Sequence, residues 1–247
     1  MTTEISTIET KFPGLVPGSR AQRIIQANLD GEPLRETDLV RIKTPAGGGT
    51  VWSYDRNGNT ETADEIVGLI VGYGKRGYLW NSENPAEERP LVTSHDLVTG
   101  YRTNDKLGDV DAATLEQFRV GDRKYDWVKL ADPDGPFGFG TARGAGKRVK
   151  ESRLLAILPK GFTLPILVSI GPGSLADFMA FMRRCDGLIW ERVVGLKLVK
   201  EKSADGIPYS KIIPRLLELV SEEEGEVARK LYYDPVQSML DAPPFLG

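Results

Sequence analysis

The clearest pattern of apolar positions lies between residues 65 and 80. Ile66 to Val71 is an apolar run with one glycine, which is typical of a strand buried on both faces. The run is punctuated by Gly72, Gly74 and Gly77 and by the basic pair Lys75-Arg76. It resumes at once with Tyr78, Leu79 and Trp80. This arrangement predicts a hairpin with a basic tip and aromatic stems.

Shorter apolar or alternating runs predict further strands. They cover residues 39–44, 51–54, 153–158, 164–170, 190–200 and 207–219. Asn57-Gly58 follows the second of these runs and is a strong signal for a tight hairpin turn.

Two helices are predicted from spacing and from end signals. Over residues 173–185, apolar side chains recur at helical intervals after a capping serine. A second helix opens at Ser221 with acidic residues in its first turn, where the helix dipole favours them. It is expected to reach about Tyr233, and residues 234–247 are expected to be loose.

The order of these elements predicts a mainly β chain with some helix, of the α+β class. An OB-fold is a five-stranded Greek-key barrel with a helix before its last two strands, and the helix at 173–185 occupies that place. We therefore expect an OB-like barrel of five to six strands over residues 38–220, with a long inserted loop at 81–136. A flexible segment at 1–37 and a helix with a tail at 221–247 would flank it. An unrelated α+β sheet domain gives the same order and stays open.

Composition limits the chemistry. The 247 residues include 32 basic and 35 acidic residues, one cysteine and one histidine. A protein with a net charge of −3 that binds nucleic acid needs a local basic face. An internal disulfide, a four-cysteine zinc site and a two-histidine metal motif are excluded. No apolar run spans a membrane and the N-terminus has no hydrophobic signal core, so we expect a cytoplasmic protein without membrane contact.

The stretch from Phe137 to Lys150 combines four glycines with four cations. It is not a phosphate-binding P-loop, because Thr141 stands where that motif has glycine and Arg148 where it has Ser or Thr. Mobile backbone, positive charge and leading aromatics suit a single nucleic-acid strand. A solvated loop without a ligand is an equally open interpretation.

Aromatic side chains next to cations are the second candidate for binding. Bases stack on aromatic faces while neighbouring cations hold phosphates. Alternation places Tyr78 and Trp80 on one face, and Trp52 and Tyr54 on another, so core packing explains them equally well. The predicted nucleic-acid-binding residues are Trp52, Tyr54, Tyr73, Lys75, Arg76, Tyr78, Trp80, Phe139, Arg143, Lys147, Arg148 and Lys150.

Three acids, Asp105, Asp109 and Asp111, raise the alternative of a metal-dependent nucleic-acid-processing enzyme or accessory subunit. Their spacing lacks the glycine and terminal glutamate of a calcium-binding loop, so a solvated turn is favoured. His95 lies in the same polar region and is expected to be a surface residue. We predict no catalytic residue, no metal site and no cofactor, and therefore no enzyme.

Several segments resemble a family of phage and prophage proteins with OB-fold single-stranded-DNA binding. They are residues 41–50, 115–118, 144–148, 153–158 and 164–175, and the likeness covers about residues 39–215. The resemblance implies sequence-tolerant binding of single-stranded DNA in phage DNA replication or recombination, in the host cytoplasm. Relatives carry cysteines just before residues 115–118. This chain has Asp109, Asp111 and Ala112 there, so a metal-stabilised version of that loop is lost.

The C-terminal residues, from Leu240 to Gly247, are similar to the acidic, Pro-Phe-ended tails of bacterial and phage single-stranded-DNA-binding proteins. The resemblance implies replication or recombination proteins as partners, with Phe245 as the docking residue. Here only one acid precedes Phe245, and Leu246-Gly247 follow it. Two further possibilities stay open: that the protein forms a homo-oligomer, and that it is a non-catalytic phage assembly or host-interaction protein.

Overall fold

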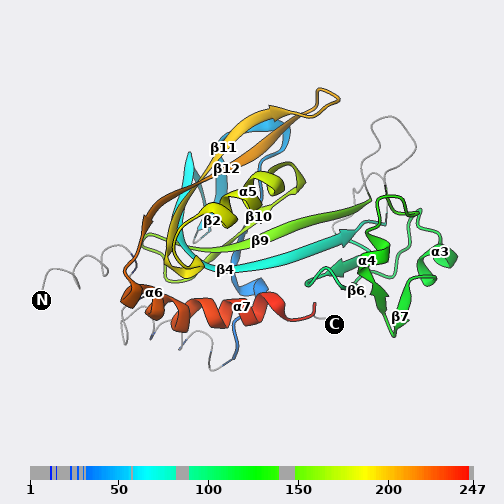
Figure 1. Cartoon of the computed structure of the whole chain (residues 1–247), viewed down its shortest axis with the longest axis horizontal. Coiled ribbons are helices and arrows are strands. Elements are labelled where there is room, and N and C mark those ends of the chain that lie inside the picture. The colour runs from blue at the N-terminus through cyan, green and yellow to red at the C-terminus, as the bar shows by residue number, and fades with distance from the viewer. Residues whose placement is uncertain are drawn as a thin grey trace, which may run out of the picture. The chain divides into compact units, whose positions relative to one another are not determined.

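The computed structural model describes residues 12, 15, 23, 27, 30, 32–56, 58–81, 89–138 and 148–244 (Figure 1). The chain divides into two compact units. The first comprises residues 1–73 and 154–240, and the second comprises residues 74–153 and 241–247. Both boundaries fall within strands, in β4 (Glu65–Leu79) and β9 (Val149–Pro159). Each of these strands therefore contributes residues to both units.

In the first unit, six strands form a sheet around the pair β9 and β4. The order is β1 (Val40–Ile42), β10 (Ile166–Ile170), β9, β4, β11 (Arg192–Lys202) and β12 (Pro208–Leu219). β1 runs parallel to β10, whereas β11 is antiparallel to both β4 and β12. A separate hairpin joins β2 (Trp52–Arg56) to β3 (Asn59–Ala63). Its turn contains Gly58 in the left-handed region, at φ 79°.

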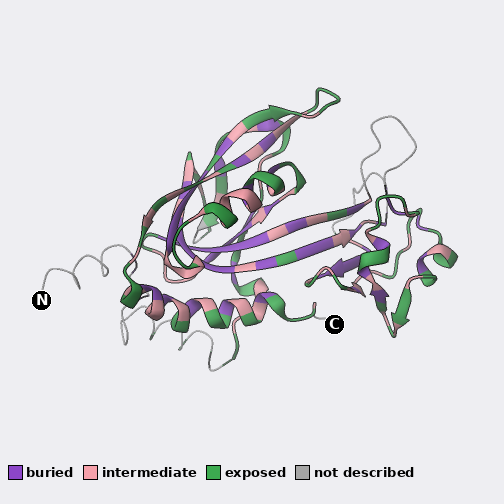
Figure 2. Ribbon diagram, in the orientation of Figure 1, coloured by how far each residue is buried: buried purple, intermediate pink, exposed green. Residues whose placement is uncertain are grey.

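Both faces of the central strands of this sheet are buried, and alternate residues of one strand enter different cores (Figure 2). On β9, Leu155 and Ile157 face the side where α5 (Pro172–Arg184) contributes Phe178. Leu154 and Leu158 face the C-terminal helices on the other side. Those helices are α6 (Glu222–Ala228), the π-helix η5 (Arg229–Tyr233) and α7 (Asp234–Asp241). Burial on both faces explains why these strands read as continuous apolar runs.

The C-terminal end of α5 is held by one buried arginine. Helix ends leave carbonyl groups without partners inside the helix. Arg192, at the start of β11, donates to the carbonyl oxygens of Met182, Cys185, Asp186 and Gly187 at 2.8–3.1 Å. The guanidinium therefore caps the helix and fixes the connection into β11, with its own charge solvated by four carbonyl dipoles.

The outer edge of β12 is closed to further strands at several positions. Alternate residues of a strand direct their N–H groups to the same edge. Pro208 and Pro214 have no N–H, and the N–H of Ile212 between them donates to Ser174 Oγ of α5 at 2.9 Å. Prolines and covered amides are common means of protecting an edge strand from unwanted pairing.

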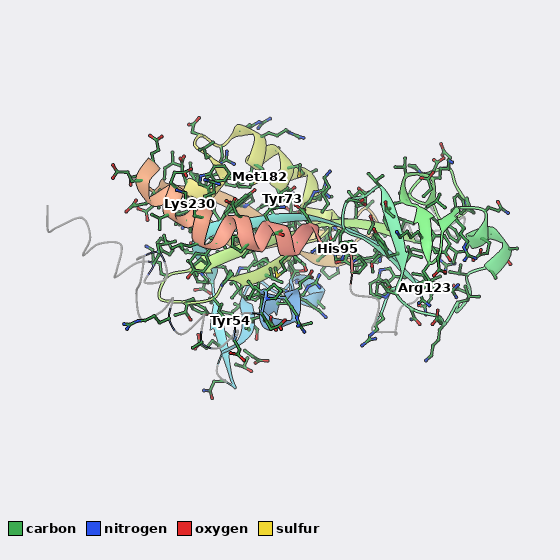
Figure 3. All side chains as sticks on the ribbon, turned by 90° about the horizontal axis from the view of Figure 1, so that it is seen from below. Tyr54, Tyr73, His95, Arg123, Met182 and Lys230 are labelled. Carbon is green, nitrogen blue, oxygen red and sulfur yellow. The ribbon has the colours of Figure 1, made fainter. Side chains whose placement is uncertain are left out.

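A side-chain amide occupies the place of a strand beside the middle of β4. The β11 ladder ends at Leu69, and the ladder to the second unit's β5 begins at Gly77. Between them, Gln237 of α7 accepts from the N–H of Tyr73 and donates to its carbonyl, both at 3.0 Å. This is the bonding that an antiparallel neighbour would supply. Figure 3 labels Tyr73 on β4, next to the ribbon of the C-terminal helix.

In the second unit, the end of β4 begins an antiparallel series. The order is β4, β5 (Val92–Ser94), β6 (Thr99–Arg102), β8 (Lys124–Asp126) and β7 (Arg119–Gly121). Two short helices, α3 (Ala112–Glu116) and α4 (Trp127–Leu130), accompany it. The unit has its own core, which includes Leu79, Val92, Leu115, Tyr125, Trp127, Leu130 and Phe137. Further 3₁₀ turns between residues 32 and 244 include η2 (Glu36–Asp38), η3 (Ala46–Gly48) and η4 (Ile189–Glu191).

The predicted α+β class is confirmed, as are a helix at 173–185 and strands whose ends lie within four residues of the expected ones. The closed OB-like barrel is not confirmed, because the described strands of the first unit form an open order from β1 to β12. The predicted insertion at 81–136 lies within the second unit. The boundaries proposed at residues 37 and 220 stay predictions.

Three local predictions were wrong. The hairpin at 72–77 does not form, because β4 continues through it to Leu79. Gly72 and Gly77 serve close packing instead: a Cβ at Gly72 would lie 2.5 Å from Val236, and one at Gly77 would overlap the Trp127 ring. Residues 234–241 form α7 rather than a loose end, and 89–136 hold four strands and two helices. None of the described helices is long and apolar enough to cross a membrane.

The pairing of Gln237 with Tyr73 predicts a stability effect. Gln237→Ala removes two hydrogen bonds from the half-buried backbone of Tyr73, and should lower the free energy of unfolding by about 1–3 kcal/mol. Urea denaturation followed by circular dichroism measures the change. Ser238→Ala, at the neighbouring exposed position of the same helix, is the control. Equal stability of the two variants would contradict the role assigned to the amide.

Candidate nucleic-acid interface

One row of side chains crosses four strands of the second unit. Tyr78 of β4 pairs with Thr93 of β5, Thr93 pairs with Tyr101 of β6, and Tyr101 pairs with Lys124 of β8. Directly opposed residues of neighbouring strands project from the same face. The row therefore places a threonine between two tyrosines and ends in a cation.

The opposite face of these strands packs into the core of the second unit, which leaves the row on the other side. Leu79, Val92 and Tyr125, which alternate with the row, are all buried. Trp127 packs over Gly77 and Gly100, and a Cβ at Gly77 would overlap its ring. The glycines thus admit the indole against the sheet.

The row and its neighbours provide half-buried aromatic rings with positive charge close by. Trp80 lies beside Tyr78, with ring centroids 6.4 Å apart and planes inclined by 36°. The Nζ of Lys124 lies 5.9 Å from the centroid of the Tyr101 ring, within cation–π range. Thr93 is only 8% exposed, and its Oγ1 has no hydrogen-bond partner within the described part of the chain.

A hydrogen-bonded turn precedes β6 and positions Tyr101. The carboxylate of Asp96 accepts from the N–H groups of Val98 and Thr99 at 2.8 Å, and from the Ser94 hydroxyl at 3.0 Å. Burial acts to raise the pKa of Asp96. The hydrogen bonds from Thr99, Val98 and Ser94 together outweigh it and lower the pKa. The ionised carboxylate is therefore the form that holds the turn.

Arg148 fixes the strand end that carries Trp80. Its guanidinium donates to the Trp80 carbonyl at 3.3 Å and forms an ion pair with Asp109. The arginine side chain is 15% exposed. Arg148, predicted as a phosphate contact, is therefore engaged with groups of its own unit.

The carboxylates considered for a metal site each bind a different group of the protein. Asp105 lies 3.5 Å from Arg102 and 3.2 Å from Arg123, which Figure 3 labels. Asp111 caps α3 by accepting from the Thr114 N–H at 2.7 Å, and bonds from the Thr114 hydroxyl and N–H lower its pKa. No group of three His, Cys, Asp or Glu residues arranged for a metal occurs among the residues that the structure describes.

Three of the predicted aromatic residues have packing partners in the first unit. Trp52 is fully buried, and its Nε1 donates to the Leu196 carbonyl at 2.9 Å, so its ring offers no face to a base. Tyr54 lies next to Phe162, with centroids 6.5 Å apart. Tyr73 stacks on Phe178 at 6.0 Å, and its hydroxyl donates to the Met179 sulfur at 2.7 Å.

The other predicted binding residues are divided among three situations. Tyr78 and Trp80 lie together in the second unit, where Lys75 and Lys150 are exposed. Arg76 is 1% exposed and donates to the Lys75 carbonyl at 2.7 Å. The positions outside the described residues are Phe139, Arg143, Lys147 and Phe245.

The sequence reasoning missed Thr93, Tyr101 and Lys124, although a signal was present. Polar and apolar side chains alternate from Lys124 through Tyr125 to Asp126. Each strand has only three or four residues, and the polar segments between them concealed the pattern.

His95 contacts the C-terminal residues of its own unit. Its Nδ1 lies 2.6 Å from the carbonyl oxygen of Ala242. Since a carbonyl only accepts, Nδ1 carries the proton in this contact. The ring is half-buried rather than freely exposed, and its bond ties the segment after α7 to β5.

Comparisons with known proteins give little guidance. No protein-family model matches the chain, and no solved structure matches it. A stretch of 97 residues is 29% identical to the CRISPR-associated endonuclease/helicase Cas3 of Thermus thermophilus. The matched stretch covers 36% of this chain and 10% of that protein, so the chain spans about a tenth of the length of this curated relative.

The packing beneath the row predicts a large effect of one methyl group. Gly77→Ala forces the new Cβ against the Trp127 ring and should destabilise the protein by about 1–3 kcal/mol through overpacking. Urea denaturation provides the measurement. Gly121→Ala in the same unit is the control, because its Cβ would meet only Lys124 at an ordinary 3.7 Å. If both variants unfold at the same urea concentration, the close approach is not real.

The turn at Asp96 predicts an acid dependence. Because the folded-state pKa lies below the ordinary value of 3.8, the carboxylate contributes stability at neutral pH that is lost as the pH falls through the folded-state pKa. Asp96→Asn should be less stable at pH 7 and lose less stability on acidification than the unaltered protein. Denaturant titrations between pH 7 and pH 3 measure this, and parallel curves would contradict it.

Proposed function

We propose that the protein binds single-stranded DNA with little sequence preference, through the row Tyr78, Thr93, Tyr101 and Lys124 with Trp80 beside it. The observation that carries the proposal is the row itself: aromatic rings on one face of an antiparallel sheet, with a cation over one ring. Every base has a π-face, so stacking on such rings is sequence-tolerant.

The distribution of charge supports a single strand as ligand. The chain is net negative, so a polynucleotide must meet a local group of cations rather than a general field. Lys75, Lys124 and Lys150 are exposed in the second unit, which also contains Tyr78, Tyr101 and Trp80. Stacked bases and phosphates held by lysines are the two ordinary components of single-strand binding.

A binding role without catalysis remains part of the proposal. The competing idea of a metal-dependent nuclease rested on Asp105, Asp109 and Asp111. Each of these already serves an arginine or a helix cap. The name of the Cas3 relative refers to an endonuclease and helicase, but the matched tenth of that protein adds no argument for catalysis here.

The proposal does not depend on a closed OB-like barrel. An open antiparallel face presents side chains in the same alternating way as a barrel strand. The resemblance of the sequence to phage proteins is the basis for a role in phage DNA replication or recombination, with partner proteins docking at Phe245. This role is part of the proposal.

Removal of one ring should weaken binding strongly. A stacked base contributes about 1–3 kcal/mol, so Tyr101→Ala should weaken binding of oligo-dT by roughly 5- to 150-fold. Fluorescence anisotropy of a labelled oligonucleotide at low salt measures the affinity. Tyr101→Phe retains the ring and should bind as the unaltered protein does. If the unaltered protein does not bind oligo-dT at low salt, the proposed function is wrong.

Salt dependence tests the role of the cation. Each phosphate neutralised on a single strand contributes about 0.7 to the slope of log affinity against log salt concentration. Lys124→Ala should therefore reduce the slope by about 0.7. Lys160→Ala, at an exposed turn of the first unit, should leave it unchanged. Equal slopes for both variants would remove Lys124 from the interface.

A further inference from the structure

Thr93 differs from the other residues of the row because it is a buried polar group without a partner. It is 8% exposed, and its Oγ1 receives or donates no hydrogen bond within the described residues. Leaving a buried hydroxyl unsatisfied is unfavourable, and such groups in native structures call for a reason. Valine would fit a β-strand at this position equally well, without that cost.

The neighbours of Thr93 are suited to hold a flat ring above it. Thr93 pairs with Tyr78 on one side and with Tyr101 on the other. Opposed Cα atoms of antiparallel strands are about 4.5–5.5 Å apart, so the two tyrosines start roughly 10 Å from each other. Stacked aromatic rings prefer centroid separations of about 4.5–7 Å. One ring inserted between the two tyrosines meets both at the lower end of this range.

We propose that Tyr78 and Tyr101 form a slot for one nucleobase, which displaces the side chains that bury the Thr93 hydroxyl and bonds that hydroxyl through its polar edge. This rests on the proposed function and specifies how the strand is recognised: by its bases as well as its phosphates. A hydroxyl donates one hydrogen bond and accepts others, so it satisfies any base edge. The slot therefore distinguishes a strand with bases from one without them, but does not distinguish one base from another.

The test uses Thr93→Val in the full chain, with oligo-dT, oligo-dC and an abasic strand of equal length as probes. The variant should bind both base-containing strands about three- to tenfold more weakly, as expected for one hydrogen bond, and the abasic strand unchanged. Its midpoint of thermal unfolding without DNA should rise, because the unsatisfied hydroxyl is gone. Thr93→Ser retains the hydroxyl and should retain the affinity.

Thr99→Val is the matched control, since Thr99 lies on the same face of β6 but pairs with Asp126 outside the slot. It should leave the affinity for all three probes unchanged. The inference is overturned if Thr93→Val binds oligo-dT as the unaltered protein does. A loss that is equal on the abasic strand, or confined to one base, also overturns it. Failure of the unaltered protein to bind oligo-dT would instead refute the proposed function itself.

Discussion

Strand β4 must meet two different requirements along its fifteen residues, and the packing inside each unit depends on it. Its first half is buried on both faces, whereas its last residues bury one face and turn Tyr78 outward. Glycines make this possible where neighbours approach most closely: Gly72 faces Val236, and Gly77 faces Trp127. A side chain at either glycine would separate the strand from the element that covers it.

Much of the first unit was predictable, because burial on both sheet faces produces long apolar runs that survive in the sequence. The helix that carries Phe178 was found from the helical spacing of its apolar side chains. The end of β4 was misread, because glycine signals a turn and also close packing, and the sequence alone does not distinguish these causes. The C-terminal helix α7, which begins directly after Tyr233, was missed because Pro235 and polar residues conceal the helical spacing of Val236 and Leu240.

The candidate site was predictable only in part, because its residues come from four strands that are distant in sequence. Tyr78 and Trp80 were found through local alternation. Tyr101 and Lys124 join them only through strand pairing, which no local pattern encodes. Trp52 shows the opposite error: an aromatic in a short strand looked available, but its indole N–H bonds a carbonyl of β11 in the core.

The protected edge of β12 has a consequence for the proposed binding to single-stranded DNA. Many copies bound to one DNA strand would reach a local concentration far above that in free solution, where an open sheet edge would join neighbours into fibres. Pro208, Pro214 and the covered N–H of Ile212 remove donors at three positions of this edge, and so interrupt the ladder that such growth needs. In the proposed complex, crowded copies would then lie side by side and still separate when the DNA is released.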